Sequence, residues 1–143
     1  MMDASRFSLV KPTLDTLIHI DFEWWKTFDN NWRVHLLGCL CPEHQSVFTD
    51  AESGWIDQVD PKTAEVFTVD SLQHILMSHC ARQPDFVTSH TTLVEAAFRT
   101  FLANGNTPLS INDLAEKIGK PSKIVLQTIA GPKIYKGIRP YHG

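Results

Sequence analysis

The sequence predicts an α+β protein that is mainly helical. In several segments apolar residues recur every three or four positions, which is typical of helices with one buried face. One pair of short segments flanks a proline-containing turn and predicts a small β-hairpin. The C-terminal third reads as three helices followed by a strand. The chain has 143 residues and is 43% hydrophobic, which suits one domain or two small ones.

The N-terminal segment, residues 1–17, is expected to be a loose arm because Pro12 opposes an early helix. It lacks the charged-then-apolar layout of a signal peptide. No apolar run reaches the ~18–20 residues that a bilayer span requires. We therefore expect a cytoplasmic protein without a membrane partner.

Residues 19–41 are predicted to form one helix, with Asp21 as N-cap and Pro42 as its end. Apolar side chains three, four and seven residues apart share one face of it, and at this spacing tryptophans indicate core rather than an aromatic ligand site. The face consists of Phe22, Trp25, Trp32, Leu36 and Cys39.

Residues 55–69 predict the hairpin, with its turn at residues 60–63. A helix is then expected over residues 70–82, capped by Asp70 with Gln73 at the capping-box position. These elements would make residues 18–90 an acidic, tryptophan-rich α+β region.

Residues 91–143 predict a basic domain. A helix is expected from Thr91 or Thr92 to residue 104, ended by Asn104-Gly105. Ser110 and Asp113 have capping-box spacing and open a short helix to residue 119. Another helix follows over residues 122–131, and weak alternation over 132–141 predicts a terminal strand.

Ala115, Gly119 and Val125 lie in the sequence LAEKIGKPSKIV, residues 114–125. Two helices that cross closely at a tight turn require a small residue at the crossing, a glycine in the turn and a branched apolar residue in the second helix. The pattern resembles the helix-turn-helix of the winged-helix superfamily over about fifty residues. The resemblance implies a tri-helical core with residues 132–141 as the wing.

In that superfamily the second helix of the pair enters the DNA major groove. Carried over by position, the resemblance implies base or phosphate contacts near the start of that helix and flanking phosphate contacts from the wing. Residues 1–92 carry a net charge of −7 and residues 93–143 one of +4, which fits a basic face for a polyanion. The implied nucleic-acid-binding residues are Ser122, Lys123, Gln127, Thr128, Lys133, Lys136 and Arg139.

These features predict a small DNA-binding or transcription-associated protein, with residues 18–90 serving dimerisation or partner docking. The alternative is a protein–protein interaction module whose winged helix does not bind DNA. One exposed stripe of the implied cations would favour DNA, whereas pairing with acidic residues would favour docking. No phosphate loop, nucleophile elbow or zinc-protease motif is present, so an enzyme is not expected.

The sequence GCLCPEH brings Cys41 and His44 close together, and His79 and Cys80 follow on a later helix. Zinc prefers such ligands. However, the spacing matches no familiar finger, and adjacent residues on a helix point about 100° apart, so His79 and Cys80 are not expected to ligate one ion together. Two buried thiols with solvated histidines are therefore expected, with zinc as the alternative. His74 is a further candidate ligand, and Cys39 is expected in the core.

Overall fold

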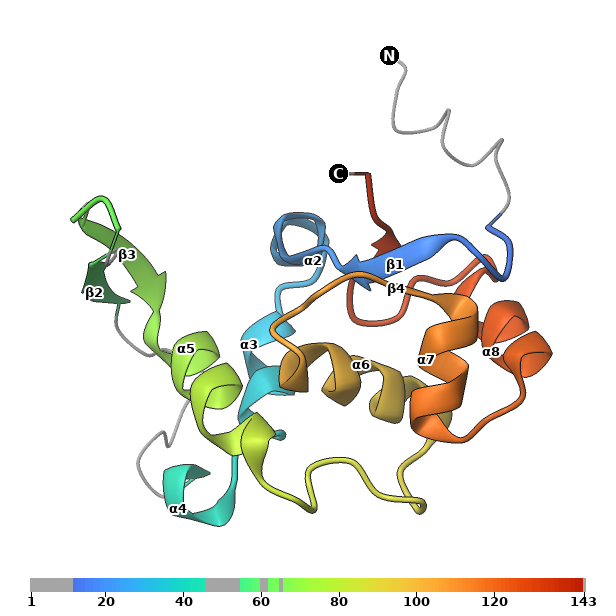
Figure 1. Ribbon diagram of the computed structural model, residues 1–143. Coiled ribbons are helices and arrows are strands. Elements are labelled where there is room, and N and C mark those ends of the chain that lie inside the picture. The colour runs from blue at the N-terminus through green and yellow to red at the C-terminus, as the bar shows by residue number, and fades with distance from the viewer. Residues whose placement is uncertain (1–11, 46–54, 60–61, 65, 143) are drawn as a thin grey trace. The chain divides into compact units, whose positions relative to one another are not determined.

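The computed structural model describes residues 12–45, 55–59, 62–64 and 66–142 (Figure 1). The protein is α+β and mainly helical, as predicted. The chain forms two compact units. The terminal unit consists of Met1–Trp25 and Val87–Gly143, and the central unit consists of Lys26–Phe86. The predicted boundary at residue 90 lies close to Phe86, whereas residues 18–25 fall in the terminal unit.

A three-stranded antiparallel sheet in the order β4-β1-β5 explains that difference. Strand β1 (Leu17–Ile20) lies in the middle and pairs with both β4 (Leu109–Ser110) and β5 (Ile138–Pro140). The expectation of a helix from residue 19 is therefore wrong for residues 19 and 20. Their backbone groups are satisfied across the sheet, and the Asn106 side chain both accepts from the Ile20 N–H and donates to its carbonyl, each at 2.9 Å.

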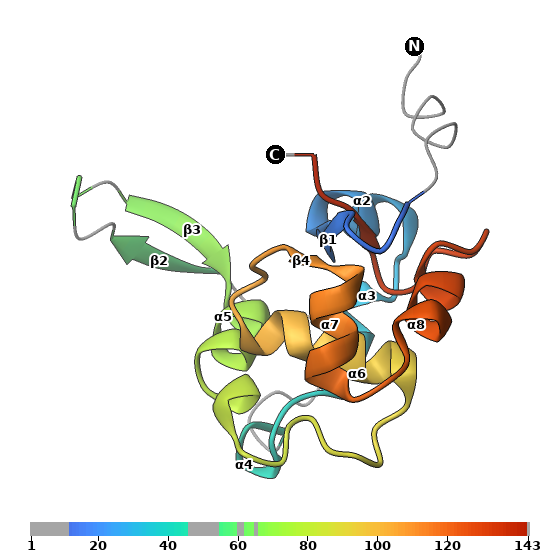
Figure 2. The same cartoon turned by 45° about the vertical axis from the view of Figure 1, so that its right-hand side comes forward.

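Three helices of the terminal unit follow the prediction closely. They are α6 (Leu93–Ala103), α7 (Ile111–Ile118) and α8 (Ser122–Ile129), and α6 packs against the other two (Figure 2). The Ser110 hydroxyl accepts from the Asp113 N–H at 3.0 Å, as the capping box predicts. Gly119 has a φ of +70°, which the left-handed end of α7 requires.

The core of the terminal unit is aromatic at its centre. Trp25 meets Phe98 edge to face at 5.3 Å between ring centroids. Gly137 lies against this pair with a φ of +75°, and a Cβ there would stand 2.8 Å from the Trp25 Cβ. The other fully buried large side chains of this unit are Ile18, Ile20, Phe101, Leu102, Ile111, Leu114 and Val125.

The long helix predicted over residues 19–41 is interrupted. Helix α2 (Phe22–Phe28) ends before helix α3 (Trp32–Leu37) begins. The boundary between the two units falls within α2, after Trp25. The Asp29 carboxylate accepts from the Asn31 N–H at 2.8 Å. The Asp29 side chain thus offers this backbone group an alternative to a helical hydrogen bond. Asp21 nevertheless caps α2 as predicted, accepting from the Trp24 N–H at 3.0 Å.

In the central unit, β2 (Trp55–Val59) and β3 (Val66–Asp70) form the predicted antiparallel hairpin, whose turn lies partly outside the described residues. Asp70 caps α5 (Ser71–Ser78) by accepting from the Leu72 and Gln73 N–H groups, and it also pairs with Arg33 of α3. In the described part of the chain, no helix is both long and apolar enough to cross a bilayer.

Candidate metal centre

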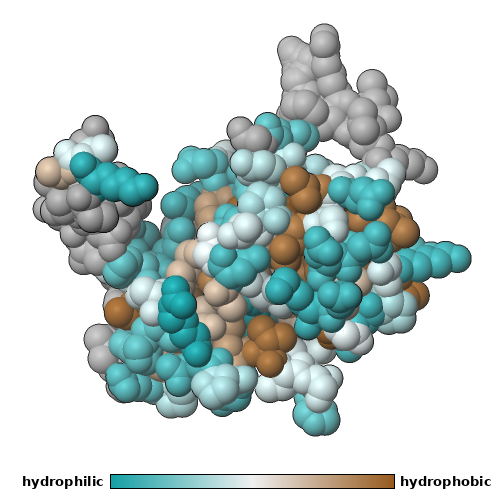
Figure 3. Space-filling view, in the orientation of Figure 1, coloured by the Kyte–Doolittle hydropathy of each residue, from teal (hydrophilic) through white to brown (hydrophobic). Residues whose placement is uncertain are grey.

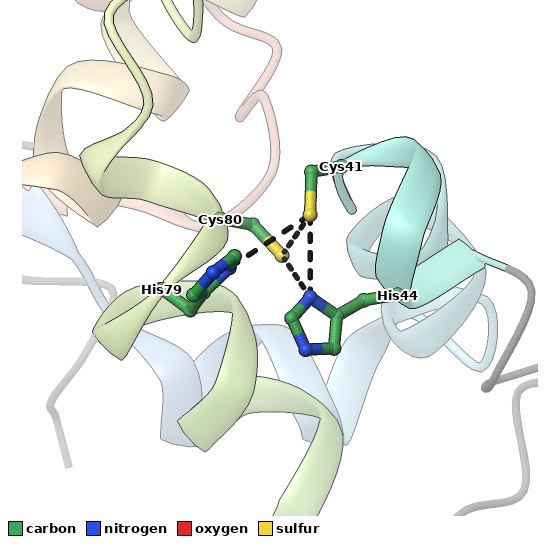
Figure 4. A group of neighbouring side chains, drawn as sticks. All are labelled: Cys41, His44, His79 and Cys80. Atoms are coloured by element: carbon green, nitrogen blue, oxygen red, sulfur yellow. Dashed lines mark hydrogen bonds between the residues drawn. The ribbon is translucent and has the colours of Figure 1, made fainter.

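Two short segments of the central unit bring four metal-binding side chains together. We call Cys41, His44, His79 and Cys80 the Cys/His cluster. Any two of their ligand atoms lie within 4.8 Å of each other (Figure 4). Within the described residues it is the one group of this kind.

The first segment is α4 (Pro42–Gln45), a single helical turn. Pro42 begins this turn instead of merely ending the preceding helix, as expected of proline at a first helical position. The Cys41 carbonyl accepts from the N–H groups of His44 at 3.0 Å and Gln45 at 2.9 Å. Residues three apart on a helical turn share a face, so Cys41 and His44 point the same way.

The second segment is the end of α5. The helix stops at Ser78, and His79 has a φ of −128° and a ψ of −62° before the 3₁₀ turn η1 (Cys80–Arg82) begins. The expectation that His79 and Cys80 diverge is therefore wrong, because it assumed an unbroken helix. The turn at His79 directs both side chains towards Cys41 and His44.

Four of the distances between the ligand atoms are close to the edges of a tetrahedral zinc site. The Cys41 and Cys80 sulfurs lie 3.4 Å apart. The His44 Nδ1 atom lies 3.2 Å from the Cys41 sulfur and 3.5 Å from the Cys80 sulfur, and the His79 Nδ1 atom lies 3.8 Å from the Cys41 sulfur. Zinc bonded to thiolate and imidazole at its usual lengths gives tetrahedral edges of ~3.8 Å between sulfurs and ~3.6 Å from sulfur to nitrogen.

Burial grades across the cluster. Cys80 is fully buried, whereas the other three side chains are partly exposed. Burial raises the pKa of the Cys80 thiol to about 11, and the neighbouring Cys41 side chain adds to the rise. A neutral thiol is thus favoured unless a cation stabilises the thiolate, so metal binding here would release protons.

The other two candidate residues lie outside this cluster. Cys39 is buried at 3% exposure, as its place on the apolar face predicts. His74 lies within α5 and does not belong to the group.

The residues implied for DNA binding do not form one exposed stripe of cations. Lys136 donates to Glu95 at 2.7 Å and lies over the Phe98 ring. Arg139 donates to Asp21 at 3.0 Å and lies over the Trp24 ring. These two cations are engaged inside the terminal unit and are only about one-fifth exposed.

The remaining members lie on or after α8. Lys123 and Gln127 are exposed on that helix, and Lys133 is exposed over the Tyr135 ring. Thr128 donates its hydroxyl to the carbonyl four residues earlier, at 2.9 Å, and Ser122 is half-buried. The segment predicted as a wing contains β5, which pairs with β1.

The acidic partners of these cations were not predicted from the sequence. Glu95 also pairs with Arg99, one turn later on α6. That four-residue spacing was a visible signal for this ion pair. No local signal marks the Glu95–Lys136 and Asp21–Arg139 pairs, since their members are far apart in sequence.

No protein-family model, curated protein or solved structure matches this chain.

Proposed function

We propose that this chain is a zinc-binding protein in which one ion, held by the Cys/His cluster, ties α4 to the α5–η1 turn. The observation that carries the proposal is the convergence of two sulfurs and two imidazole nitrogens within 4.8 Å. Two thiolates and two imidazoles in a tetrahedral arrangement suit zinc among the common metals. Four protein ligands leave no open position, so the role is structural rather than catalytic.

The small size of the central unit, Lys26–Phe86, supports a structural ion. Among its residues whose burial the structure describes, Phe86 is the one aromatic side chain in the buried apolar set. Small units with a limited core are commonly stabilised by a metal. The buried members are Leu36, Cys39, Leu40, Leu72, Leu76, Cys80, Ala81 and Phe86.

Metal content and cobalt substitution test this proposal. We expect one zinc ion per purified chain, and a Co²⁺ form whose absorption is that of a tetrahedral site with two thiolates. Cys41→Ser and His79→Asn should each weaken metal binding by at least tenfold. Cys39→Ser and His74→Asn are the matched controls and should retain it. A protein that binds neither ion tightly, or controls that fail as badly as the cluster variants, would contradict the proposal.

A second candidate function is DNA contact by α8, supported by the exposure of Lys123 and Gln127 on that helix. Because Lys136 and Arg139 are engaged in ion pairs, two phosphate contacts are expected, from Lys123 and Lys133. A plot of log affinity against log salt should then have a slope near −2, from ~0.9 per phosphate.

Fluorescence anisotropy of a labelled duplex at several salt concentrations measures that slope. The variant Lys123→Ala should reduce it by about one, whereas Lys62→Ala in the central unit should leave it unchanged. Absence of binding at low salt would overturn DNA contact and leave protein–protein interaction as the function of this helix.

A further inference from the structure

We propose that the Cys41–Cys80 pair is an oxidation site, at which a peroxide forms a disulfide and expels the zinc ion. The inference rests on the proposed zinc site and goes beyond it, because it makes metal occupancy depend on oxidants. The observation that supports the inference is the 3.4 Å separation of the two sulfurs, which belong to different segments of the central unit.

The separation suits bond formation. A disulfide has an S–S length of about 2.05 Å, so the sulfurs need to approach by roughly 1.4 Å. The two cysteines lie 39 positions apart in the chain. Cys41 directly precedes the helical turn α4, and Cys80 begins η1. Side-chain rotation and a small shift of one segment can supply this approach.

Exposure sets the order of events. Cys41 is partly exposed and Cys80 is fully buried, so a small peroxide meets the Cys41 sulfur first. Zinc keeps both sulfurs as thiolates, which are the nucleophilic form. Cys41 is therefore the oxidised thiol, and Cys80 is the resolving one.

The chemistry balances with hydrogen peroxide as oxidant. The Cys41 thiolate attacks one peroxide oxygen, the O–O bond breaks, and hydroxide leaves and is protonated to water. The resulting sulfenic acid is attacked by the Cys80 thiolate, the S–O bond breaks, and a second hydroxide leaves and becomes water. The two sulfurs lose two electrons in total, and the peroxide gains them.

Zinc release follows from the ligand count. A disulfide sulfur is a poor ligand, so the oxidised cluster offers only the imidazoles of His44 and His79. Two ligands do not make a structural zinc site. A thiol reductant would restore the four-ligand set and allow the ion to return.

The test uses the full chain loaded with zinc, with its zinc content measured before peroxide is added. Graded hydrogen peroxide is then applied, released zinc is read with a chromogenic chelator, and disulfides are mapped by non-reducing peptide mass spectrometry. We expect one zinc ion released per Cys41–Cys80 disulfide, and rebinding after reduction. Cys39→Ser should behave like the unmodified chain.

Retention of zinc at peroxide concentrations that oxidise the metal-free chain would overturn the inference while leaving the zinc site intact. Zinc release with a disulfide that includes Cys39 would overturn it as well. Cys80→Ser, which lacks the resolving thiol, should accumulate Cys41 sulfenic or sulfinic acid without a disulfide, and the same product in the unmodified chain would also contradict the proposal. A chain without zinc at the outset would instead refute the proposed function, and the inference with it.

Discussion

The two units of this protein solve the same stability problem differently. The terminal unit buries Trp25, Phe98 and Phe101 in one apolar core and closes a sheet over it. In the described part of the central unit the fully buried large side chains are those of Leu36, Leu72 and Leu76, and four side chains that can bind a metal lie together at one point. The free energy of unfolding that a close-packed core provides falls in steps as its contacts are removed, whereas a metal ion is either bound or absent. The difference teaches that the two units should respond to different perturbations.

Removal of zinc should give the largest effect. Metal binding contributes an apparent ~10–16 kcal/mol in small zinc modules, so a strong chelator should unfold the central unit. Amide hydrogen exchange should show protection lost in α5 and kept in α6. Equal loss in both helices would show that the units share one cooperative transition, and no loss in α5 would show that the ion is not structural.

Truncation of the apolar core should do the reverse. Phe98→Ala removes the ring that meets Trp25 and should destabilise the terminal unit by ~3–5 kcal/mol. The Co²⁺ spectrum of the cluster should stay unchanged, because no ligand belongs to that unit. Chemical denaturation followed by exchange in α6 measures the first effect, and loss of the cobalt spectrum would break the comparison.

A glycine pair sharpens the account of close packing. Gly137→Ala meets both a φ of +75° and the Trp25 Cβ at 2.8 Å, so a loss of ~2–3 kcal/mol is expected. Gly105→Ala has a similar φ of +73° but no atom within 4 Å of its new Cβ, and it should cost only ~1 kcal/mol. Thermal denaturation of both variants separates strain from contact, and equal losses would remove the role of contact.

The smallest expected effect concerns pH. Burial by itself raises the pKa of Glu95, but the hydrogen bonds and charges of Lys136 and Arg99 outweigh it and hold the pKa below its ordinary value. The pairing therefore stabilises the terminal unit above pH ~4.3 and is lost as the pH falls through the lower folded-state pKa. Glu95→Gln should cost about 1 kcal/mol at neutral pH and flatten the acid decline.

Exchange in α6 between pH 3 and 7 measures this effect. The exposed Glu116 on α7 provides the control substitution, Glu116→Gln, which should follow the unmodified chain. A steep acid decline that survives Glu95→Gln would assign it to other groups.

Local signals in the sequence were reliable guides to several helix ends in both units. Asp70 and Ser110 cap their helices as predicted, and Gly119 occupies the left-handed position that its turn requires. Such signals depend on a few neighbouring residues and are readable without knowledge of the fold. Hydrophobic periodicity is a signal of the same local kind. In α7 it leaves an exposed outer side that is covered by hydrophilic residues (Figure 3).

Long-range features were not predictable from the same reasoning. The pairing of β1 with β5 joins opposite ends of the sequence, and no local pattern specifies it. At the Cys/His cluster the four residues were named as candidate ligands, but their convergence was not expected, because it depends on a helix ending at Ser78 rather than at residue 82. One turn of helix decided whether the four side chains could meet, and element boundaries are the least certain part of a sequence-based assignment.

The central position of β1 in its sheet has a consequence for synthesis on the ribosome. Ile18 leaves the exit tunnel long before its partner Pro140 is synthesised. The terminal unit thus depends on long-range strand pairing and cannot complete its sheet until β5 has been synthesised. The central unit, Lys26–Phe86, is contiguous and emerges in between. The nascent chain can therefore fold this inserted unit first, around the zinc ion that we propose, before the preceding strand finds its partners.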